Sequence, residues 1–332
     1  MIALLASIPS PSRNVIEIGP LTIHFYGIMI AVGVIVAVLV AKRRYERYGG
    51  SGEMVERVSI WTVIVGFLGA RLGYVITHTG DFVDQPWEIL FIWKGGLALY
   101  GGLIAGTITA VLLLRRWRGD VFAFGDAVAV GLPLAQVIGR FGNYFNQELF
   151  GTPSDLPWAV EIDGRIADAA GYPGYTTFHP TFLYEALWNL FITAGVILWL
   201  ERRGKLFKGA SIAVYLMLYG VGRFLMELMR TDTTFRFLGL SRNGWVSAGA
   251  VLVGAALFWW MQRRHEVRTL VGPPVFIAPG AETVSAPIEA DEDADDGDEA
   301  SDGSDEIESA DEEASDGDHF VADDPAVTDP PS

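Results

Sequence analysis

The sequence contains no cysteine, so it forms neither a disulfide nor a thiolate metal site, and it has no cysteine nucleophile. Histidine is scarce as well. The five histidines are scattered without the spacing of metal ligands: His24, His78, His179, His265 and His319. Residues 1–20 lack the basic start of a secretory signal, and Pro9, Pro11 and Arg13 interrupt them. We therefore expect no metal, no cofactor and no cleavable signal peptide.

Basic residues are missing from the C-terminal part of the chain. Between Ala281 and Ser332 there are 21 acidic residues and no Lys or Arg. The net charge of −16 reflects this segment, because the first 280 residues hold 19 acidic residues against 24 basic ones. A segment this acidic and poor in apolar residues cannot bury enough surface to fold. We predict that residues 269–332 form a disordered cytoplasmic tail, a solvated appendage.

The rest of the chain is rich in apolar stretches, and 51% of all residues are hydrophobic. A helix needs about 20 mostly apolar residues to cross a bilayer. The stretches that meet this condition are Leu21–Ala41, Val58–Thr77, Gly95–Leu114, Phe122–Ile138, Thr181–Leu200, Gly209–Met229 and Trp245–Met261. Glycine-rich sequence makes the third and fourth candidates for broken or re-entrant helices. The predicted fold is an all-α integral membrane protein with about seven transmembrane helices in residues 1–268 and a small extracytoplasmic head at about 147–180.

Basic residues gather on alternate connections between these stretches. Fifteen of the 24 bases lie there: Lys42, Arg43, Arg44, Arg47, Arg57, Arg115, Arg116, Arg118, Arg202, Arg203, Lys205, Lys208, Arg263, Arg264 and Arg268. Connections rich in Lys and Arg face the cytoplasm. The N-terminus is therefore predicted outside and the C-terminus inside. The tryptophans between His78 and Lys94 indicate a position at the membrane interface.

Arg71, Arg140 and Arg223 lie within or at the ends of apolar stretches. An arginine at the bilayer centre costs about 2.5 kcal/mol or more, so it needs a partner and usually has a function. Gly69 and Gly73 flank Arg71, and small residues four apart let helices pack closely. Arg71 therefore has either a functional role or, as the alternative, a purely structural one in which it pairs with a neighbouring group.

The strongest polar cluster runs from Gly139 to Gly151, with the sequence GRFGNYFNQELFG. If its start is helical, Arg140, Asn143 and Gln147 share one face. A guanidinium with amide donors suits the oxygens of a phosphate, and the glycines let backbone come close to a ligand. The pattern predicts a phosphate site, with a hydrogen-bond network at a helix end as the alternative.

A second polar stripe falls on one helical face of the sixth stretch: Tyr219, Arg223, Glu227 and Arg230. It lies in the same outer half of the membrane as Arg140. Two arginine-bearing faces at one depth predict a phosphate pocket with a carboxylate that orients it. An intramembrane ion pair between Arg223 and Glu227 is the alternative.

Further polar residues stand at the outer ends of other stretches. His179 is expected to cap the fifth span, with Pro180 in its first turn and Glu185 one turn inside the membrane. One interpretation is that His179 and Glu185 shape the outer opening of the site or transfer a proton. The alternative is that they form only a helix cap and an ion pair. Tyr100 stands between two glycine pairs, which either present it to a neighbour or form a packing seam. Tyr26 opens the first span at a similar depth.

Together these residues resemble the prolipoprotein diacylglyceryl transferase family of bacterial inner membranes. The resemblance covers roughly residues 15–262, with its specific signature in 139–151 and weaker motifs at 24–27, 69–74, 95–102, 179–185 and 219–227. It implies transfer of the diacylglyceryl group of phosphatidylglycerol to the lipobox cysteine thiol of a prolipoprotein signal peptide. A thioether forms and glycerol phosphate leaves. The missing cysteine fits, because the sulfur comes from the substrate.

The resemblance implies functional roles for Arg140, Asn143, Glu148 and Arg223, with Tyr26, Tyr219 and Glu227 in support. With the patterns above, the predicted catalytic residues are Arg140, Arg223, Glu227, Tyr26, Tyr100 and Glu148. The predicted phosphatidylglycerol-binding residues are Arg140, Asn143, Asn146, Gly151, Arg71, Tyr219, His179 and Glu185. We also expect a monomer in the bacterial plasma membrane and no nucleic-acid partner.

One departure concerns Tyr100, where many members of the family carry a histidine that is a candidate general base. A tyrosine, with an ordinary pKa of about 10, is a poor base at neutral pH. Either the base lies elsewhere, at Glu227 or Glu148, or catalysis rests on phosphate polarisation by Arg140 and Arg223. In the second case the thiol loses its proton to a nearby group or to water. The second interpretation is favoured, because stabilisation of developing charge is often the largest catalytic effect.

Two other classes of protein compete with a transferase. A transporter of a small anionic solute or lipid also needs intramembrane arginines and broken helices, but it commonly has two halves of matching hydropathy. The sequence shows no such repeat. A structural subunit does not need three intramembrane arginines and an extended polar signature.

Overall fold

The structure is a computed structural model that describes residues 7–19, 21–91, 95–229 and 236–267. Within these ranges seven helices are long and apolar enough to cross a membrane. They are α1 (Phe25–Arg47), α2 (Gly52–Thr77), α3 (Leu99–Arg116), α4 (Val121–Asn146), the run of α6 (Thr181–Leu187), η4 (Trp188–Ala194) and α7 (Gly195–Arg202), α8 (Ala210–Met229) and α9 (Arg242–Arg264). The predicted multi-pass all-α membrane fold is confirmed. The predicted tail at 269–332 and Arg230 lie outside the described residues.

α4 is one uninterrupted helix, although Pro133 lies inside it. The carboxylate of Asp120 caps its start and accepts hydrogen bonds from the backbone N–H groups of Phe122 and Ala123, at 2.9 Å each. A helix of 26 residues is about 39 Å long, more than the roughly 30 Å of the hydrocarbon core. The polar signature is therefore helical beyond Ile138, the predicted end of the span, as far as Asn146.

α3 is also unbroken, but it begins at Leu99, four residues later than predicted. Gly95 and Gly96 have φ values of 85° and 70°, which glycine adopts readily and an α-helix excludes. α3 packs closely on α2, since a Cβ atom on Gly101 would lie 2.4 Å from the carbonyl oxygen of Gly69. This contact agrees with the predicted role of the small residues around Arg71.

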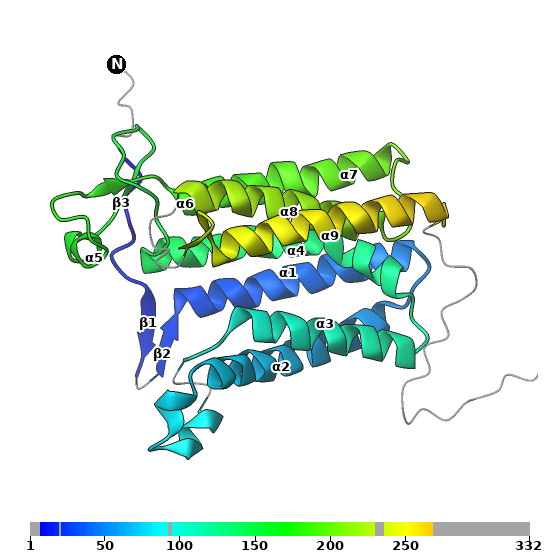
Figure 1. The fold of residues 1–332 in the computed structure, drawn as a ribbon, viewed down its shortest axis with the longest axis horizontal. Helices are drawn as coiled ribbons and strands as arrows, with labels where there is room; N and C mark the ends of the chain where they lie inside the picture. The colour runs from blue at the N-terminus through cyan, green and yellow to red at the C-terminus, as the bar shows by residue number, and fades with distance from the viewer. Residues whose placement is uncertain (1–6, 20, 92–94, 230–235, 268–332) are drawn as a thin grey trace, which may run out of the picture. The chain divides into compact units, whose positions relative to one another are not determined.

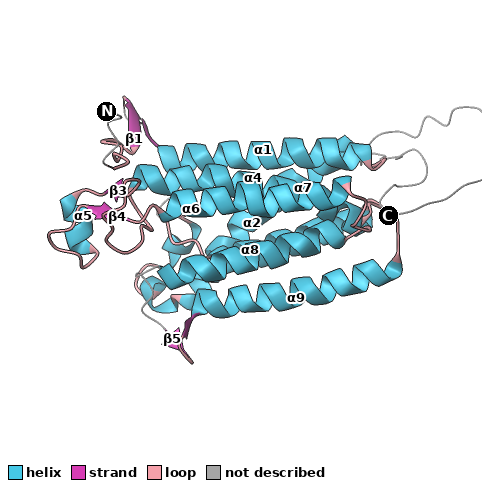
Figure 2. Ribbon diagram, turned by 90° about the horizontal axis from the view of Figure 1, so that it is seen from above, coloured by secondary structure: helices cyan, strands magenta, loops and turns pink. Residues whose placement is uncertain are grey.

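α4 contacts most of the other helices: α1, α3, α6, η4, α7 and α8 (Figures 1 and 2). Its contact with α1 is tight, because a Cβ atom on Gly131 would lie 2.7 Å from the carbonyl oxygen of Ala37. α8 and α9 form another extensive pair. Residues on α4 and α8 therefore meet side chains from several helices.

One end of the helix bundle, on the left in Figure 1, carries the short elements, and we call it the head end. The antiparallel pairs are β1 (Val15–Ile18) with β2 (Leu21–His24), β3 (Val160–Glu161) with β4 (Thr177–Phe178), and β5 (Arg236–Phe237) with β6 (Leu240–Ser241). The short helices are η1 (Thr79–Phe82), η2 (Pro86–Leu90) and α5 (Gly164–Ala169). Residues between α4 and α6 have a small core of their own, made of Val160, Ile162, Ala167 and Phe178.

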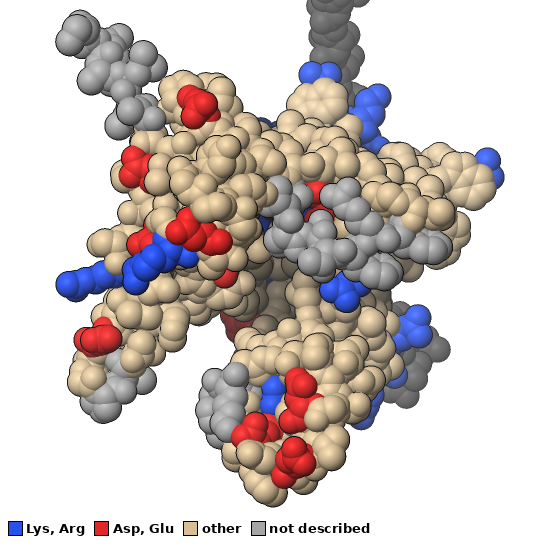
Figure 3. All heavy atoms as spheres, turned by 60° about the vertical axis from the view of Figure 1, so that its left-hand side comes forward, with Lys and Arg blue, Asp and Glu red and all other residues tan. Residues whose placement is uncertain are grey.

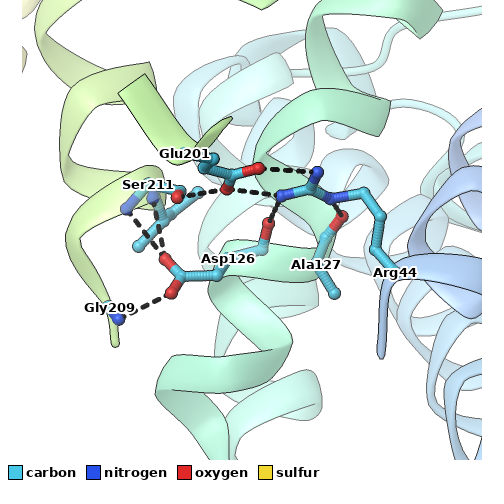
Figure 4. A network of polar contacts seen from close by, with 7 residues as sticks. Arg44, Asp126, Ala127, Glu201, Gly209 and Ser211 are labelled. Carbon is cyan, nitrogen blue, oxygen red and sulfur yellow. Dashed lines mark hydrogen bonds and ion pairs between the residues drawn. The ribbon is translucent and has the colours of Figure 1, made fainter. Parts of the chain in front are cut away.

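The opposite end of the bundle contains a buried ion pair between Arg44 of α1 and Glu201 of α7, at 2.7 Å (Figure 4). Arg44 also donates to the backbone carbonyls of Asp126 and Ala127 in α4, at 2.9 and 3.1 Å. The Asp126 carboxylate in turn accepts from the backbone N–H of Ser211 at the start of α8, at 2.9 Å. The network joins four helices and leaves the buried guanidinium neutralised, as a buried charge requires.

Candidate functional site

Arg140 lies on α4 near the head end and is ion-paired with Glu185 of α6. Its other terminal nitrogen donates to Oδ1 of Asn143 at 3.3 Å, and Nδ2 of Asn143 donates to Oε1 of Glu148 at 2.7 Å. The side chains of Arg140 and Glu185 are only 18% and 6% exposed. One continuous polar chain thus leads from the buried Glu185 to the exposed Glu148.

Gln147 does not share the face of Arg140 and Asn143, so this part of the helical prediction was wrong. α4 ends at Asn146, and Gln147 has a φ of 53° in the left-handed region. Its side chain turns to the head, where Nε2 donates to the carbonyl of Pro11 at 3.2 Å and Oε1 accepts from the N–H of Asp163 at 2.7 Å.

The second arginine face centres on Arg223, which is ion-paired with Glu227 at 2.7 Å. The hydroxyl of Ser241, at the start of α9, donates to the other oxygen of that carboxylate at 2.6 Å. The ion pair that the sequence offered as an alternative is therefore present. One donor of Arg223 remains unused, because its buried Nη1 has no hydrogen-bond partner among the described residues.

Tyr219 lies where these two faces meet. Its hydroxyl is within electrostatic range of Arg140, Arg223, Glu185 and Tyr100. The predicted convergence of the two arginine-bearing helices thus has structural support. We use the name arginine site for the residues Arg140, Asn143, Glu148, Glu185, Tyr219, Arg223 and Glu227.

Two other predicted tyrosines border the arginine site. Tyr26 is within electrostatic range of Arg140 and Glu148, and its ring packs on Gly142, where a Cβ atom would lie 2.7 Å from the ring. The hydroxyl of Tyr100 donates to Oδ1 of Asn243 at 3.0 Å. The hydrogen bond anchors Tyr100 to α9 beside Tyr219.

Arg71 is not brought into the arginine site. Its guanidinium donates to the carbonyls of Glu88, Ile89 and Gly95, at 2.5, 2.9 and 2.6 Å. Arg71 is 7% exposed. These bonds tie the connection that contains η1 and η2 to α2, and they favour the structural alternative for Arg71.

His179 was expected to cap the fifth span, but Pro180 occupies the N-cap position and no side chain caps α6. Pro180 lacks a hydroxyl or carboxylate, and Nδ1 of His179 lies instead 3.2 Å from the hydroxyl of Tyr184. Gly151 donates its N–H to the carbonyl of His179 at 3.0 Å. Both residues therefore join the head to α6, near Thr181, whose hydroxyl bonds to the carbonyl of Leu149.

Four residues of this region were missed from the sequence: Ser241, Asn243, Gln136 and Tyr215. Ser241 had a readable signal, because it stands directly before an apolar span and accepts from the N–H of Gly244 at 3.0 Å, as an N-cap does. Nothing local marks the other three. Oδ1 of Asn146, a predicted residue, is buried without a hydrogen-bond partner among the described residues.

The arginine site combines two guanidinium groups that are mostly closed to solvent, and Nη1 of Arg223 has no hydrogen-bond partner among the described residues. Such a group binds an oxyanion strongly, because its donors match two oxygens at once and little water competes. Figure 3 views the head end and shows a hollow between the lobe that carries η1 and η2, at the bottom, and the rest of that face. Across the described residues, no three or more His, Asp and Glu side chains group as metal ligands.

Comparison with known proteins identifies a family and several relatives of this chain. The model of the family described as prolipoprotein diacylglyceryl transferase matches residues 13–260. A phosphatidylglycerol–prolipoprotein diacylglyceryl transferase 2 of Streptomyces coelicolor is 42% identical over 264 residues, 79% of this chain and 83% of its own length. The transferase of Leifsonia xyli is 42% identical over 315 residues, which cover 90% and 92% of the two chains. That of Bifidobacterium longum is 41% identical over 271 residues, 76% of this chain and 85% of its own.

Proposed function

The chain belongs to the prolipoprotein diacylglyceryl transferase family, and we propose that it transfers the diacylglyceryl group of phosphatidylglycerol to the cysteine thiol of prolipoproteins. The observation that carries this proposal is that α4, which bears Arg140, and α8, which bears Arg223, pack against each other, with each arginine paired to a carboxylate. An intramembrane anion site on a lipid-facing bundle fits a phospholipid. The transporter alternative finds no support in the family or in the relatives.

The reaction exchanges one bond to carbon for another. The thiolate sulfur attacks the glyceryl carbon that carries the phosphate ester, the C–S bond forms, and the C–O bond breaks. The electron pair of that bond stays on the phosphate, which leaves as glycerol phosphate. We assign the main catalytic effect to Arg140 and Arg223, whose fixed donors stabilise the charge that develops on the leaving oxygen.

The proton of the thiol must reach an acceptor. Glu227 is bound by Arg223 and Ser241, whereas Glu148 is exposed and accepts a hydrogen bond from Asn143. The hydroxyl of Tyr100 donates a hydrogen bond to Oδ1 of Asn243. We propose that the thiol proton passes to water or to a neighbouring carboxylate, and that Tyr100 acts by holding α3 to α9.

Orientation and acceptor are further parts of the proposal. The predicted cytoplasmic connections 42–57, 115–118 and 202–208 lie at the end opposite the head, so we place the head end and the arginine site on the outer side of a bacterial plasma membrane. The acceptor is the lipobox cysteine of a signal peptide. That cysteine becomes available on the outer side, where the arginine site then lies.

A transfer assay tests the proposal. Purified protein in phosphatidylglycerol receives a fluorescent lipobox peptide, and lipidation is followed by mobility shift. We expect the wild type to modify the peptide, Arg140→Ala to lose at least about a hundredfold in rate, and a peptide with Ser for Cys to remain unmodified. Arg165→Ala is the matched control, because this head arginine is 92% exposed and pairs only with Asp163 in the ion pairs described. Folded wild-type protein that modifies no peptide would refute the transferase.

A further inference from the structure

Four polar residues form a layer beneath the arginine site: Gln136, Asn189 and Tyr215 lie about one helical turn below it, and Thr193 lies one turn deeper. We call them the inner polar layer. Gln136 precedes Arg140 by four residues, Asn189 follows Glu185 by four, and Tyr215 precedes Tyr219 by four. α4 and α8 run towards the head end and α6 runs away from it, so each of the three lies about 6 Å deeper in the bundle than its counterpart.

One hydrogen bond joins two members of this layer, and one ring contact joins the layer to the arginine site. Nε2 of Gln136 donates to the hydroxyl of Tyr215 at 2.8 Å. The ring of Tyr215 stacks on that of Tyr219, with centroids 5.7 Å apart and planes within 15°. Asn189 and Thr193 belong to the buried face of η4 together with Ala194, and Ala194 packs in one core cluster with Tyr215.

The layer has hydrogen-bonding capacity that the described residues do not use. Oε1 of Gln136, Oδ1 of Asn189 and Oγ1 of Thr193 are buried and have no hydrogen-bond partner among the described residues. Thr193 is 0% exposed and Asn189 is 4% exposed. A buried polar group without a hydrogen-bond partner destabilises the folded protein by about 1–3 kcal/mol. Three such groups together therefore destabilise it strongly unless a ligand or water bonds to them.

The backbone conformation of η4 also indicates a functional site. η4 is a π-helical segment inside an otherwise α-helical span, and such segments are rare and frequent at functional sites. A side-chain amide that turns by 180° exchanges its oxygen and nitrogen, so Gln136 and Asn189 can offer donors. Thr193 adds a hydroxyl donor, whereas the hydroxyl of Tyr215 donates to Oε1 of Gln136 once that amide has turned. The layer can therefore bind carbonyl oxygens.

We propose that the inner polar layer binds the ester carbonyls of the diacylglyceryl group while the arginine site holds the phosphate above it. The inference rests on the proposed function. In a phospholipid the ester groups lie between the phosphate and the acyl chains, so in a bilayer they sit deeper than the phosphate, as the layer sits deeper than Arg140. Gln136 is only half-buried, and Phe191, on the same η4 segment as Asn189 and Thr193, is 64% exposed.

This arrangement makes the layer a determinant of donor specificity. Two carbonyls fixed below the phosphate hold the reacting glyceryl carbon at a set depth, in reach of the thiol. A dialkyl ether analogue of phosphatidylglycerol has the same headgroup and leaving group but lacks these carbonyls. The wild type should therefore use the ether donor less well than the ester donor.

The test measures kcat/KM for both donors, with equal chain lengths, in the full-length protein. We expect the wild type to favour the ester by about tenfold, the order of one or two hydrogen bonds. Thr193→Val and Asn189→Leu should lower the ester value to that of the ether and leave the ether value unchanged. Thr109→Val is the control, because its hydroxyl bonds to the carbonyl of Ala105 in its own helix.

Other outcomes overturn the proposal. Equal losses on both donors would mean that the layer holds water or only shapes the bundle. A changed preference against phosphatidylethanol, which lacks the headgroup hydroxyls, would assign the layer to the headgroup instead. If the wild type transfers from neither donor, the proposed function fails, and the layer is then tested by the relative binding of the two lipids in native mass spectrometry.

Discussion

The guanidinium of Arg140 on α4 and the carboxylate of Glu185 on α6 form an ion pair that is almost closed to solvent. It joins two helices and at the same time orients the arginine that we assign to the phosphate. Removal of one partner from such a pair leaves an uncompensated charge and costs about 3–5 kcal/mol. The pair therefore serves stability and function through the same atoms.

Glu185→Gln should lower both thermal stability and transfer rate, because Arg140 loses its neutralising and orienting partner. The double variant Arg140→Met with Glu185→Leu should regain stability, since apolar side chains of similar volume replace buried pairs well, but it should remain inactive. Thermal unfolding in detergent and the peptide assay measure the two effects separately. An active double variant would show that Arg140 does not touch the phosphate.

Gly222 lies next to Arg223 and faces the indole of Trp188. A Cβ atom at Gly222 would lie 2.2 Å from Nε1 of Trp188, whose N–H donates to the carbonyl of Leu218 at 2.9 Å. Gly222→Ala should push η4 from α8, displace Arg223 and lower the transfer rate by about ten- to a hundredfold. Gly249→Ala is the control, because no atom lies within 4 Å of its Cβ position. The control should retain activity and gain up to about 1 kcal/mol from helix propensity.

Replacement of Arg44 should lower the stability of the protein without a specific loss of transfer activity. Arg44→Met removes the partner of the buried Glu201 and should destabilise the bundle by about 3–5 kcal/mol. The network lies at the end opposite the arginine site, so the KM for phosphatidylglycerol of the folded fraction should not change. Arg43→Met, at an exposed neighbour, should stay within about 0.5 kcal/mol of the wild type. A large rise in KM for Arg44→Met would link the two ends.

The ionisation of Asp120 should make the stability of the protein depend on pH. Burial acts to raise the pKa of its carboxyl, but the hydrogen bond from Lys208, at 2.8 Å, and those from two backbone N–H groups lower the pKa more, so it falls below its ordinary value. The stabilisation is therefore complete above the ordinary pKa of about 4 and is lost as the pH falls through the lowered one.

Melting of the wild type and Asp120→Asn between pH 6 and pH 3 measures this effect. The wild type should be more stable at pH 6, and the difference should shrink as the pH approaches 3. Asn keeps the helix cap, whereas Asp120→Ala should lose about 1 kcal/mol more at every pH. A constant difference between the wild type and Asp120→Asn would contradict the role of the charge.

The sequence predicted ion pairs and hydrogen bonds only between residues that lie close together in the chain. Arg223 and Glu227 are one turn apart in a helix, and the sequence alone suggested their ion pair. Arg140 and Asn143 likewise follow from helical spacing. Gln147 shows the limit, because the helix ends one residue earlier and a left-handed residue turns the side chain to the head. The end of a helix depends on the contacts it finds there.

The sequence by itself determined that the chain spans a membrane, how often it does so, and which end is basic. These properties follow from hydropathy and charge, which act locally along the chain. Only the tertiary structure decided the partners: Glu185 for Arg140, Asn243 for Tyr100 and backbone carbonyls for Arg71. The packing of helices far apart in sequence selects among many polar groups of similar chemistry, and no local pattern encodes that selection.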